Sequence, residues 1–455
     1  MKIPRGGKAR YRFLAVAAAM LLLLAACATQ PGPSLPPGFE MVEPPEPLAP
    51  RFEKMRTEGV RNWVLNLQEL AVDALYLGDR DLATMALDEA IVQIEVIYGD
   101  SEQARLARSA FYKENSKIFK GDPYERSMTY FLRGVLYMQD REWDNARACF
   151  RSAAFMDAFA EDEQHKADWA LFDYLIGVCE VRLGDASSAD DAFKRAAGTY
   201  SRFAESYEAL SAPLGIGGKS RLAGFAELPD FTRQDNLLVL TLQGYAPRKV
   251  GVGRFGEYIG IEPGGGVAGP PKVRVGSRQP ELVRTVDSVY YQAVTRGGRE
   301  LDRILGRQAQ FKGTAEDAGE VSTHLGVWAM GAGLEGHNKD VVAAGALLTL
   351  LGIASYGVAS TVQPEADTRY WGNLPDALGM YRTAYPAGEI PVEIVFPGGG
   401  AVKKETALIQ TLHLEENELC VVLAIEYPGP FACLPPGAAV TAAEPAAEPL
   451  PTATY

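Results

Sequence analysis

Cysteine and histidine are scarce in this chain of 455 residues, which contains five Cys and four His. A small secreted domain built on disulfides is thereby excluded. Besides Cys27, the cysteines are Cys149, Cys179, Cys420 and Cys433. The last two can form a disulfide in an oxidising compartment or stay buried thiols, and the sequence leaves both open. No histidine has the spacing to another His or Cys that a metal site requires, so we expect neither a metal nor a cofactor.

Basic residues are outnumbered by acidic ones. The chain has 45 Lys and Arg against 58 Asp and Glu, a formal net charge of −13 at pH 7. Nucleic acids and anionic headgroups are bound by clusters of Lys and Arg, so we expect no nucleic-acid partner. The length and the 47% of hydrophobic residues allow about two or three domains with cores of their own.

Motifs of catalytic sites are missing as well. No Gly-x-Ser-x-Gly turn with a triad is present. Gly217–Ser220 is half of a phosphate-binding loop, but Pro213 stands where the first glycine belongs. Gly251–Gly256 has the spacing of a dinucleotide fingerprint, yet the following residues are strand-like and stop at Pro263, which predicts a β-hairpin loop. We therefore expect no catalytic residue and no enzyme.

The N-terminus has the layout of a secretory signal. Residues 1–26 begin with basic residues and continue with the apolar run Phe13–Ala26. The segment Leu24–Cys27 then resembles the lipobox of bacterial lipoproteins, which implies that Cys27 carries lipid and becomes the mature N-terminus. Because Ala28 is not the aspartate that retains lipoproteins in the inner membrane, we expect an outer-membrane anchor and a periplasm-facing protein. An ordinary secretory signal or a single membrane span is the alternative.

Proline-rich segments flank the central part of the chain. Residues 27–50 contain enough proline to block helix and sheet, which predicts an extended tether. Residues 434–455 are rich in Pro and Ala and predict a disordered tail. The tether would hold the folded part away from the membrane.

Residues 51–213 repeat a pattern of small and aromatic side chains that is typical of tetratricopeptide (TPR) repeats of about 34 residues. The best copy contains Gly134, Tyr137, Ala146, Phe150 and Ala153, the second contains Gly177, Ala189, Phe193 and Ala196, and a weaker one contains Ala71, Gly78, Ala83, Leu87 and Ala90. Small residues let two antiparallel helices approach closely, while the aromatic rings fill the space between turns. We expect a TPR-like α-solenoid whose concave surface binds envelope proteins; a generic helical bundle is the alternative.

Residues 236–433 predict an α+β domain with a small β-sheet or sandwich. Strands are expected at 237–242, 272–275, 380–385, 392–396, 406–414 and 419–427, and helices at 280–310, 321–334 and 339–362. The charge-free run Val341–Val362 is long enough to span a membrane, but its small residues favour a buried helix over the sheet. The expected fold class is thus α+β multidomain, with the helical array first.

One compact polar and aromatic group, Asp367, Arg369 and Trp371, is a possible ligand loop. Asp and Arg two residues apart can clamp backbone groups or a carboxylate, and the Trp ring can stack on a ligand. The alternative is a simple connection held by an ion pair.

Several segments resemble a family of uncharacterised bacterial TPR-containing lipoproteins. These segments are Lys120–Ser127, Asn236–Lys249 and Ala366–Pro375. The resemblance implies no reaction and no catalytic residue. We expect a scaffold or assembly factor that holds another envelope protein. The alternative is a peptidoglycan- or carbohydrate-processing enzyme, or an activator of one, with its site in residues 236–433.

Overall fold

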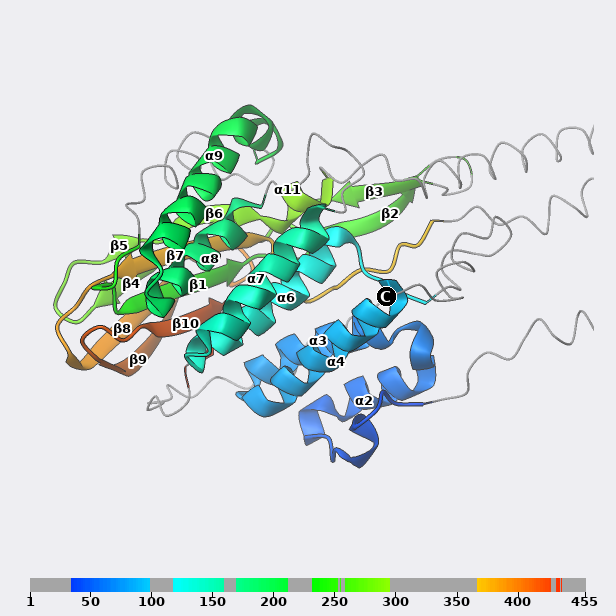
Figure 1. Cartoon of the computed structure of the whole chain (residues 1–455). Helices are drawn as coiled ribbons and strands as arrows, with labels where there is room; N and C mark the ends of the chain where they lie inside the picture. The colour runs from blue at the N-terminus through cyan, green and yellow to red at the C-terminus, as the bar shows by residue number, and fades with distance from the viewer. Residues whose placement is uncertain are drawn as a thin grey trace, which may run out of the picture.

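A computed structural model describes residues 34–98, 118–158, 169–211, 231–252, 254, 258–294, 366–426, 431–433 and 435. Within these residues the helices come first and the strands follow, so the chain has an α+β fold (Figure 1). No helix of the described part has the length and the hydropathy to cross a membrane. Cys27, the run Val341–Val362 and, apart from Pro435, the predicted tail 434–455 lie outside the described residues.

The helices form three hairpins. Before the first strand, the α-helices are α2 (Ala49–Glu58), α3 (Trp63–Tyr76), α4 (Arg80–Tyr98), α6 (Pro123–Gln139), α7 (Trp143–Ala158), α8 (Ala170–Leu183) and α9 (Ala186–Ser211), and the 3-10 helices are η1 (Phe39–Met41), η2 (Glu46–Leu48) and η3 (Gly59–Arg61). Helices α3 and α4, α6 and α7, and α8 and α9 pack as pairs. Neighbouring pairs meet through α4 with α6 and α7 with α8.

Local sequence determines where these helices begin and end. At the start of α6 the carboxylate of Glu125 accepts the backbone N–H of Asp122 at 2.6 Å in a capping box, and Pro123 occupies the first turn. Helix α8 ends at Gly184, whose φ of +87° is a left-handed conformation that favours glycine.

The second half of the predicted tether packs against the helices. Leu35, Phe39 and Leu48 are buried, and the Phe39 ring centroid lies 6.0 Å from that of Phe52 in α2. The prediction of an extended tether up to residue 50 is therefore wrong for residues 34–50. Pro37 lies in a turn, Pro47 in η2 and Pro50 in the first turn of α2, while the large apolar side chains between them enter the core.

The strands form three sheets. They are β1 (Leu237–Gln243), β2 (Arg248–Val252), β3 (Tyr258–Glu262), β4 (Lys272–Val275), β5 (Glu281–Leu282), β6 (Arg284–Ser288), β7 (Ala377–Thr383), β8 (Gly388–Phe396), β9 (Thr406–Leu414), β10 (Cys420–Ile425) and β11 (Phe431–Cys433). The strand orders are β11-β10-β1-β7-β6, β5-β4-β8-β9 and β2-β3. Strand β1 is central, because it runs parallel to β10 and antiparallel to β7. The predicted hairpin at Gly251–Gly256 is confirmed by the antiparallel pairing of β2 with β3.

The helix predicted over residues 280–310 is wrong at its beginning. Residues 281–288 form β5 and β6, and the short helix α11 (Val289–Val294) starts only afterwards. The apolar spacing fits a helix, but Thr285 and Val286 are β-branched, and β6 pairs with β7. Residues 295–310 lie outside the described residues.

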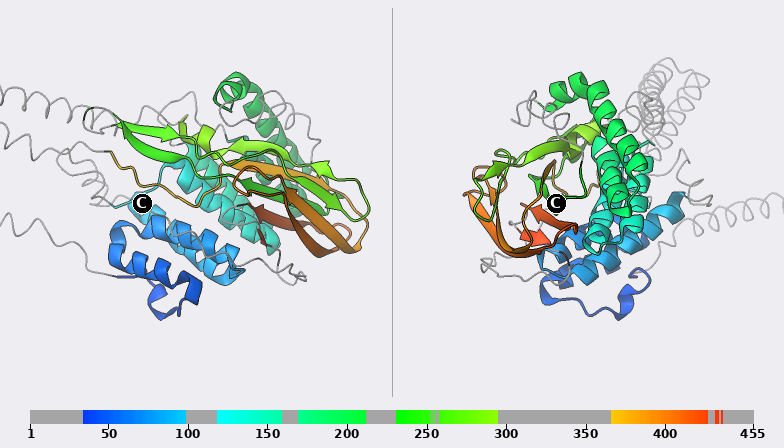
Figure 2. Two further views of the ribbon diagram at one scale, coloured as in Figure 1. Left: turned by 180° about the vertical axis from the view of Figure 1, so that it is seen from behind. Right: turned by 60° about the vertical axis from the view of Figure 1, so that its left-hand side comes forward.

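The five-stranded sheet is covered on both faces, so the fold has three layers (Figure 2). In β1, Leu238, Leu240 and Leu242 join the core shared with the helices, whereas Leu237 and Val239 join the core shared with the four-stranded sheet. Successive residues of a strand point to opposite faces, which explains why every residue of β1 is buried. One continuous core therefore joins the predicted regions 51–213 and 236–433.

Candidate functional site

The small and aromatic residues of the repeat pattern lie where the paired helices touch. A Cβ built on Gly134 would lie 2.7 Å from Cε1 of Phe150, and one on Gly177 would lie 2.6 Å from Cε1 of Phe193. The alanines of the pattern, Ala146, Ala153, Ala189 and Ala196, are all buried. Tyr137 is half-buried, with the Arg133 guanidinium 3.5 Å from its ring centroid. In the pairs α6–α7 and α8–α9, a glycine of the first helix thus faces an aromatic ring of the second.

The possible ligand loop packs inside the protein. Arg369 forms an ion pair with Asp367, with Nη2 2.6 Å from Oδ2, and also donates to Asn62 Oδ1 at 2.5 Å. Trp371 is 1% exposed, and its indole N–H donates to Asn373 Oδ1 at 2.7 Å. The Trp371 ring therefore offers no exposed face for stacking on a ligand. The geometry matches the simpler expectation, a connection held by an ion pair.

A buried carboxylate, Glu125, ties this loop to α6 and to the β2–β3 hairpin. It accepts the backbone N–H of Trp371 at 2.8 Å, and its other oxygen lies 2.7 Å from Nζ of Lys249. Lys249 also lies 2.9 Å from Asp122. Burial raises the pKa of Glu125, and the charge of Lys249 opposes that rise. Glu125 and Lys249 are enclosed, so this cluster joins elements and does not face a ligand.

A second polar cluster anchors the same loop to α3. Asn373 donates to Asp73 Oδ1 and to the carbonyl oxygen of Glu69, both at 2.9 Å. Arg51 of α2 pairs with Asp73 at 2.6 Å and with Glu69 at 2.5 Å. Burial raises the pKa of Asp73, although Arg51 partly offsets it. Sequence reasoning missed both clusters; its one available signal was the Asp-x-x-Glu capping box at Asp122 and Glu125.

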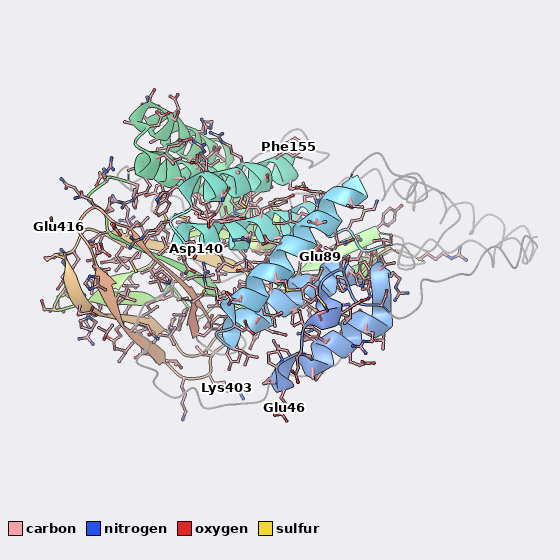
Figure 3. All side chains as sticks on the ribbon, turned by 60° about the horizontal axis from the view of Figure 1, so that its bottom comes forward. Glu46, Glu89, Asp140, Phe155, Lys403 and Glu416 are labelled. Atoms are coloured by element: carbon pink, nitrogen blue, oxygen red, sulfur yellow. The ribbon has the colours of Figure 1, made fainter. Side chains whose placement is uncertain are left out.

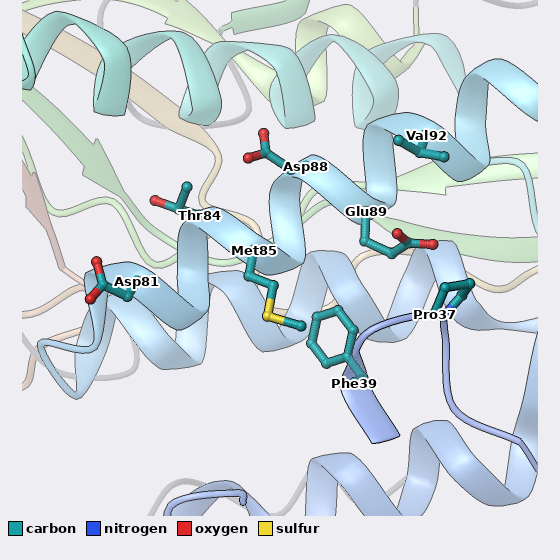
Figure 4. Close-up of a pocket in the computed structure, with 8 residues that line it drawn as sticks. All are labelled: Pro37, Phe39, Asp81, Thr84, Met85, Asp88, Glu89 and Val92. Carbon is teal, nitrogen blue, oxygen red and sulfur yellow. The ribbon is translucent and has the colours of Figure 1, made fainter. Parts of the chain in front are cut away.

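An open groove lies on the outer helix α4, with a volume of about 420 Å³ (Figure 4). Its lining consists of Pro37, Phe39, Asp81, Thr84, Met85, Asp88, Glu89 and Val92. The α4 residues recur at three or four positions and therefore share one face of the helix. Met85 and Phe39 lie side by side in the groove, while the carboxylates stand along α4 (Figure 4). The sequence did not reveal the groove, because Pro37 and Phe39 belong to the predicted tether.

The charges of the groove are only partly neutralised. Asp88 pairs with Arg133 at 2.6 Å, and Glu89 accepts the side-chain amide of Gln93 at 2.8 Å. Among the described residues, neither Asp81 nor Glu89 has a basic partner. The arrangement is an apolar strip with excess negative charge beside it, which suits binding of a partner.

The described part of the chain holds no group of three or more His, Cys, Asp or Glu side chains that could bind a metal. Burial raises the pKa of Cys149 to about 12 and that of Cys420 and Cys433 to about 11, so these thiols stay protonated. His413 is exposed beside Glu389 on the sheet, whereas His324 and His337 lie outside the described residues.

Cys420 and Cys433 are both free thiols. Cys433 belongs to the core under the helices, whereas Cys420 packs against the core between the two sheets. The two side chains are thus on opposite faces of the five-stranded sheet, so the disulfide that the sequence left open does not form here.

Comparison with family models, with curated proteins and with solved structures gave no match for this chain. The resemblance to TPR-containing lipoproteins therefore stays a prediction from the sequence.

Proposed function

We propose that this protein is a lipid-anchored periplasmic scaffold that holds another envelope protein on the outer face of its helical layer. The signal layout that ends at Cys27 supports the anchor. The three helical hairpins, with Gly134 against Phe150 and Gly177 against Phe193, support a TPR-like array.

The partner surface is proposed on the outer helices because the inner ones are already covered. Helices α3 and α6 contact β11 and β10 of the five-stranded sheet. In α6, 15 of 17 residues are buried, and in α8 ten of 14 are. The face on which the sequence expects a concave binding surface thus carries a sheet of the same chain.

The observation that carries the proposal is the groove on α4. It combines apolar side chains with carboxylates, and Val92 and Val96 continue it with 49% and 53% of their surface exposed. Exposed apolar side chains framed by polar ones are typical of protein-binding sites.

The groove itself does not have the geometry of a sugar-cleaving site, and the alternative expected from the sequence would lie elsewhere, in residues 236–433. Such enzymes place two carboxyl groups on either side of the bond that breaks. Here Asp81, Asp88 and Glu89 all belong to α4, whereas Pro37 and Phe39 form the other wall. Asp88 is also held in an ion pair with Arg133.

The test is to block the groove in the full chain with Thr84→Trp. Envelope proteins that co-purify after crosslinking in intact cells are then compared with those of the wild type. We expect Thr84→Trp to lose a partner that the matched variant Asp191→Trp, on the exposed surface of α9, retains. Equal recovery with both variants would refute a partner site on α4.

A further inference from the structure

Strand β9 is an open edge of the four-stranded sheet. All nine of its residues pair with β8 on one side, in continuous register from Phe396↔Thr406 to Gly388↔Leu414. Within the described part of the chain, no strand pairs with its other side. Such an edge presents a row of backbone N–H and C=O groups to any strand that can join it.

The other edges of the two large sheets are protected, whereas this one is not. Strand β5 has two residues, β11 has three, and β6 is interrupted by a register shift. Short strands and bulges are common protections of edges, as are Lys and Pro within the strand. Thr406–Leu414 reads Thr-Ala-Leu-Ile-Gln-Thr-Leu-His-Leu and contains no Lys, no Pro and no acidic residue. All nine residues therefore remain available for pairing.

We propose that β9 pairs with β9 of a second copy of this chain, antiparallel about a two-fold axis at Gln410. This is the only antiparallel register that pairs all nine residues. It places Leu408 opposite Leu412 on one face and the β-branched pair Ile409 and Thr411 opposite each other on the other face. The four-stranded sheets of the two copies then become one continuous sheet.

Charge complementarity at the strand ends favours this occupant. Lys403, Lys404 and Glu405 precede β9, and Glu415 and Glu416 follow it, all exposed. Figure 3 labels Lys403 and Glu416, which lie at separate places on the surface. The two-fold pairing brings Lys404 of each copy opposite Glu416 of the other and Glu405 opposite Glu415. Each end then joins a net charge of +1 (Lys403, Lys404 and Glu405) to one of −2 (Glu415 and Glu416). A parallel pairing would instead place like charges together at both ends.

A buried polar atom at the proposed axis gives a second argument. Gln410 Oε1 is buried and has no hydrogen-bond partner among the residues that the structure describes. Unsatisfied buried acceptors are rare and disfavoured. In the proposed pairing the two Gln410 side chains face each other at roughly 4.5–5.5 Å between Cβ atoms, so an amide N–H of one can reach the oxygen of the other. Pairing thus supplies the missing donor.

The test is a cysteine scan of the full chain across residues 408–412, one position at a time, with oxidation in intact cells. Residues directly opposite in an antiparallel pair have Cα atoms about 4.5–5.5 Å apart, which suits a disulfide. We expect the most disulfide-linked dimer from Gln410→Cys, and none above background from the parent chain, whose Cys149, Cys179, Cys420 and Cys433 are half-buried or buried. No dimer at any position, or a maximum elsewhere, would overturn the proposal.

A charge exchange gives an independent measurement on the purified chain without added cysteines. Lys404→Glu should weaken dimerisation in sedimentation experiments by about three- to tenfold, since it replaces two exposed ion pairs by repulsions. Adding Glu416→Lys should restore it, while Lys272→Glu in the inner strand β4 should have no effect. Failure of the double variant to recover the dimer would also overturn the proposal. The groove on α4 is not involved, so either outcome leaves the proposed function to its own test.

Discussion

The ring of Phe150 lies so close to Gly134 that a Cβ on that glycine would come within 2.7 Å of the ring carbon Cε1. Phe193 and Gly177 repeat this relationship in the next helical hairpin at 2.6 Å. In both hairpins the glycine is on the first helix and the ring on the second, so one packing solution is used twice. It determines how near the two helices of a pair approach each other.

Replacing Gly134 by Ala should therefore destabilise the protein. Overpacking of a tight contact typically costs about 1–3 kcal/mol. Gly198 in α9 is the matched control, because no atom lies within 4 Å of a Cβ added there. Gly198→Ala should stabilise the protein by up to about 1 kcal/mol, since alanine is the better helix former. Thermal unfolding measures the stability of both variants. A Gly134→Ala variant as stable as the wild type would contradict the close contact between Gly134 and Phe150.

Removal of Lys249 should destabilise the junction between the hairpin, α6 and the loop around Trp371. Lys249→Met leaves the buried carboxylate of Glu125 without its ion-pair partner, which typically costs about 3–5 kcal/mol. The double variant Lys249→Met with Glu125→Gln removes the charge as well and should regain most of that loss. Denaturant unfolding measures both. A double variant no more stable than Lys249→Met would show that the charge is not the cause.

The loss of stability caused by Lys249→Met should also depend on pH. Burial already raises the pKa of Glu125 above the ordinary value of 4.5, and loss of Lys249 raises that pKa further. A carboxyl with a raised folded-state pKa favours folding while it is protonated, and this contribution is lost as the pH rises through the folded pKa. The stability deficit of Lys249→Met should therefore be smaller near pH 5 than near pH 8. An equal or larger deficit at the lower pH would contradict the assignment.

Partner binding at the groove should depend on its two unneutralised carboxylates. Asp81→Asn with Glu89→Gln should reduce capture of a partner with a basic segment and should flatten the decrease that added salt causes, because screening acts on exposed charges. Glu53→Gln with Asp191→Asn changes the net charge equally at exposed sites outside the groove. Co-purification of the partner at low and at high salt distinguishes the groove variant from this control variant. Equal losses in both double variants would indicate an effect of net charge only.

Lipid attachment at Cys27 predicts a simple fractionation result. Cys27→Ser should release the protein from the membrane fraction and prevent labelling by a fatty-acid analogue, because the acyl chains provide the attachment. The same experiment with Cys149→Ser is the control. A membrane pool of Cys27→Ser equal to that of the wild type would contradict the lipoprotein prediction.

Much of the local structure followed from the sequence. Strands β4 and β9 have the predicted bounds, and the repeat positions lie at the helix contacts. Local patterns succeed there because each element is determined by neighbours in the chain. They failed at residues 281–288, where pairing with β7 overrides a helical spacing of apolar residues.

We did not predict from the sequence that the inner helices are covered. The segment of α8, however, contains a pattern that indicates burial. Its segment Ala170–Leu183 is apolar on nearly all sides, which is typical of a helix buried on all faces. The burial of Trp371 had no comparable signal, because its partner Glu125 lies 246 residues away in the chain. The groove on α4 likewise joins residues from two segments and exists only in the folded protein.

The central claim is that a partner binds on the outer face of α4. The most direct test is a photo-crosslinking amino acid placed at Thr84 in the full chain, with the same group at Asp191 of α9 as the control, in intact cells. We predict a discrete adduct with another envelope protein from Thr84 and none from Asp191. No adduct from Thr84, or the same adduct from both positions, would contradict the account.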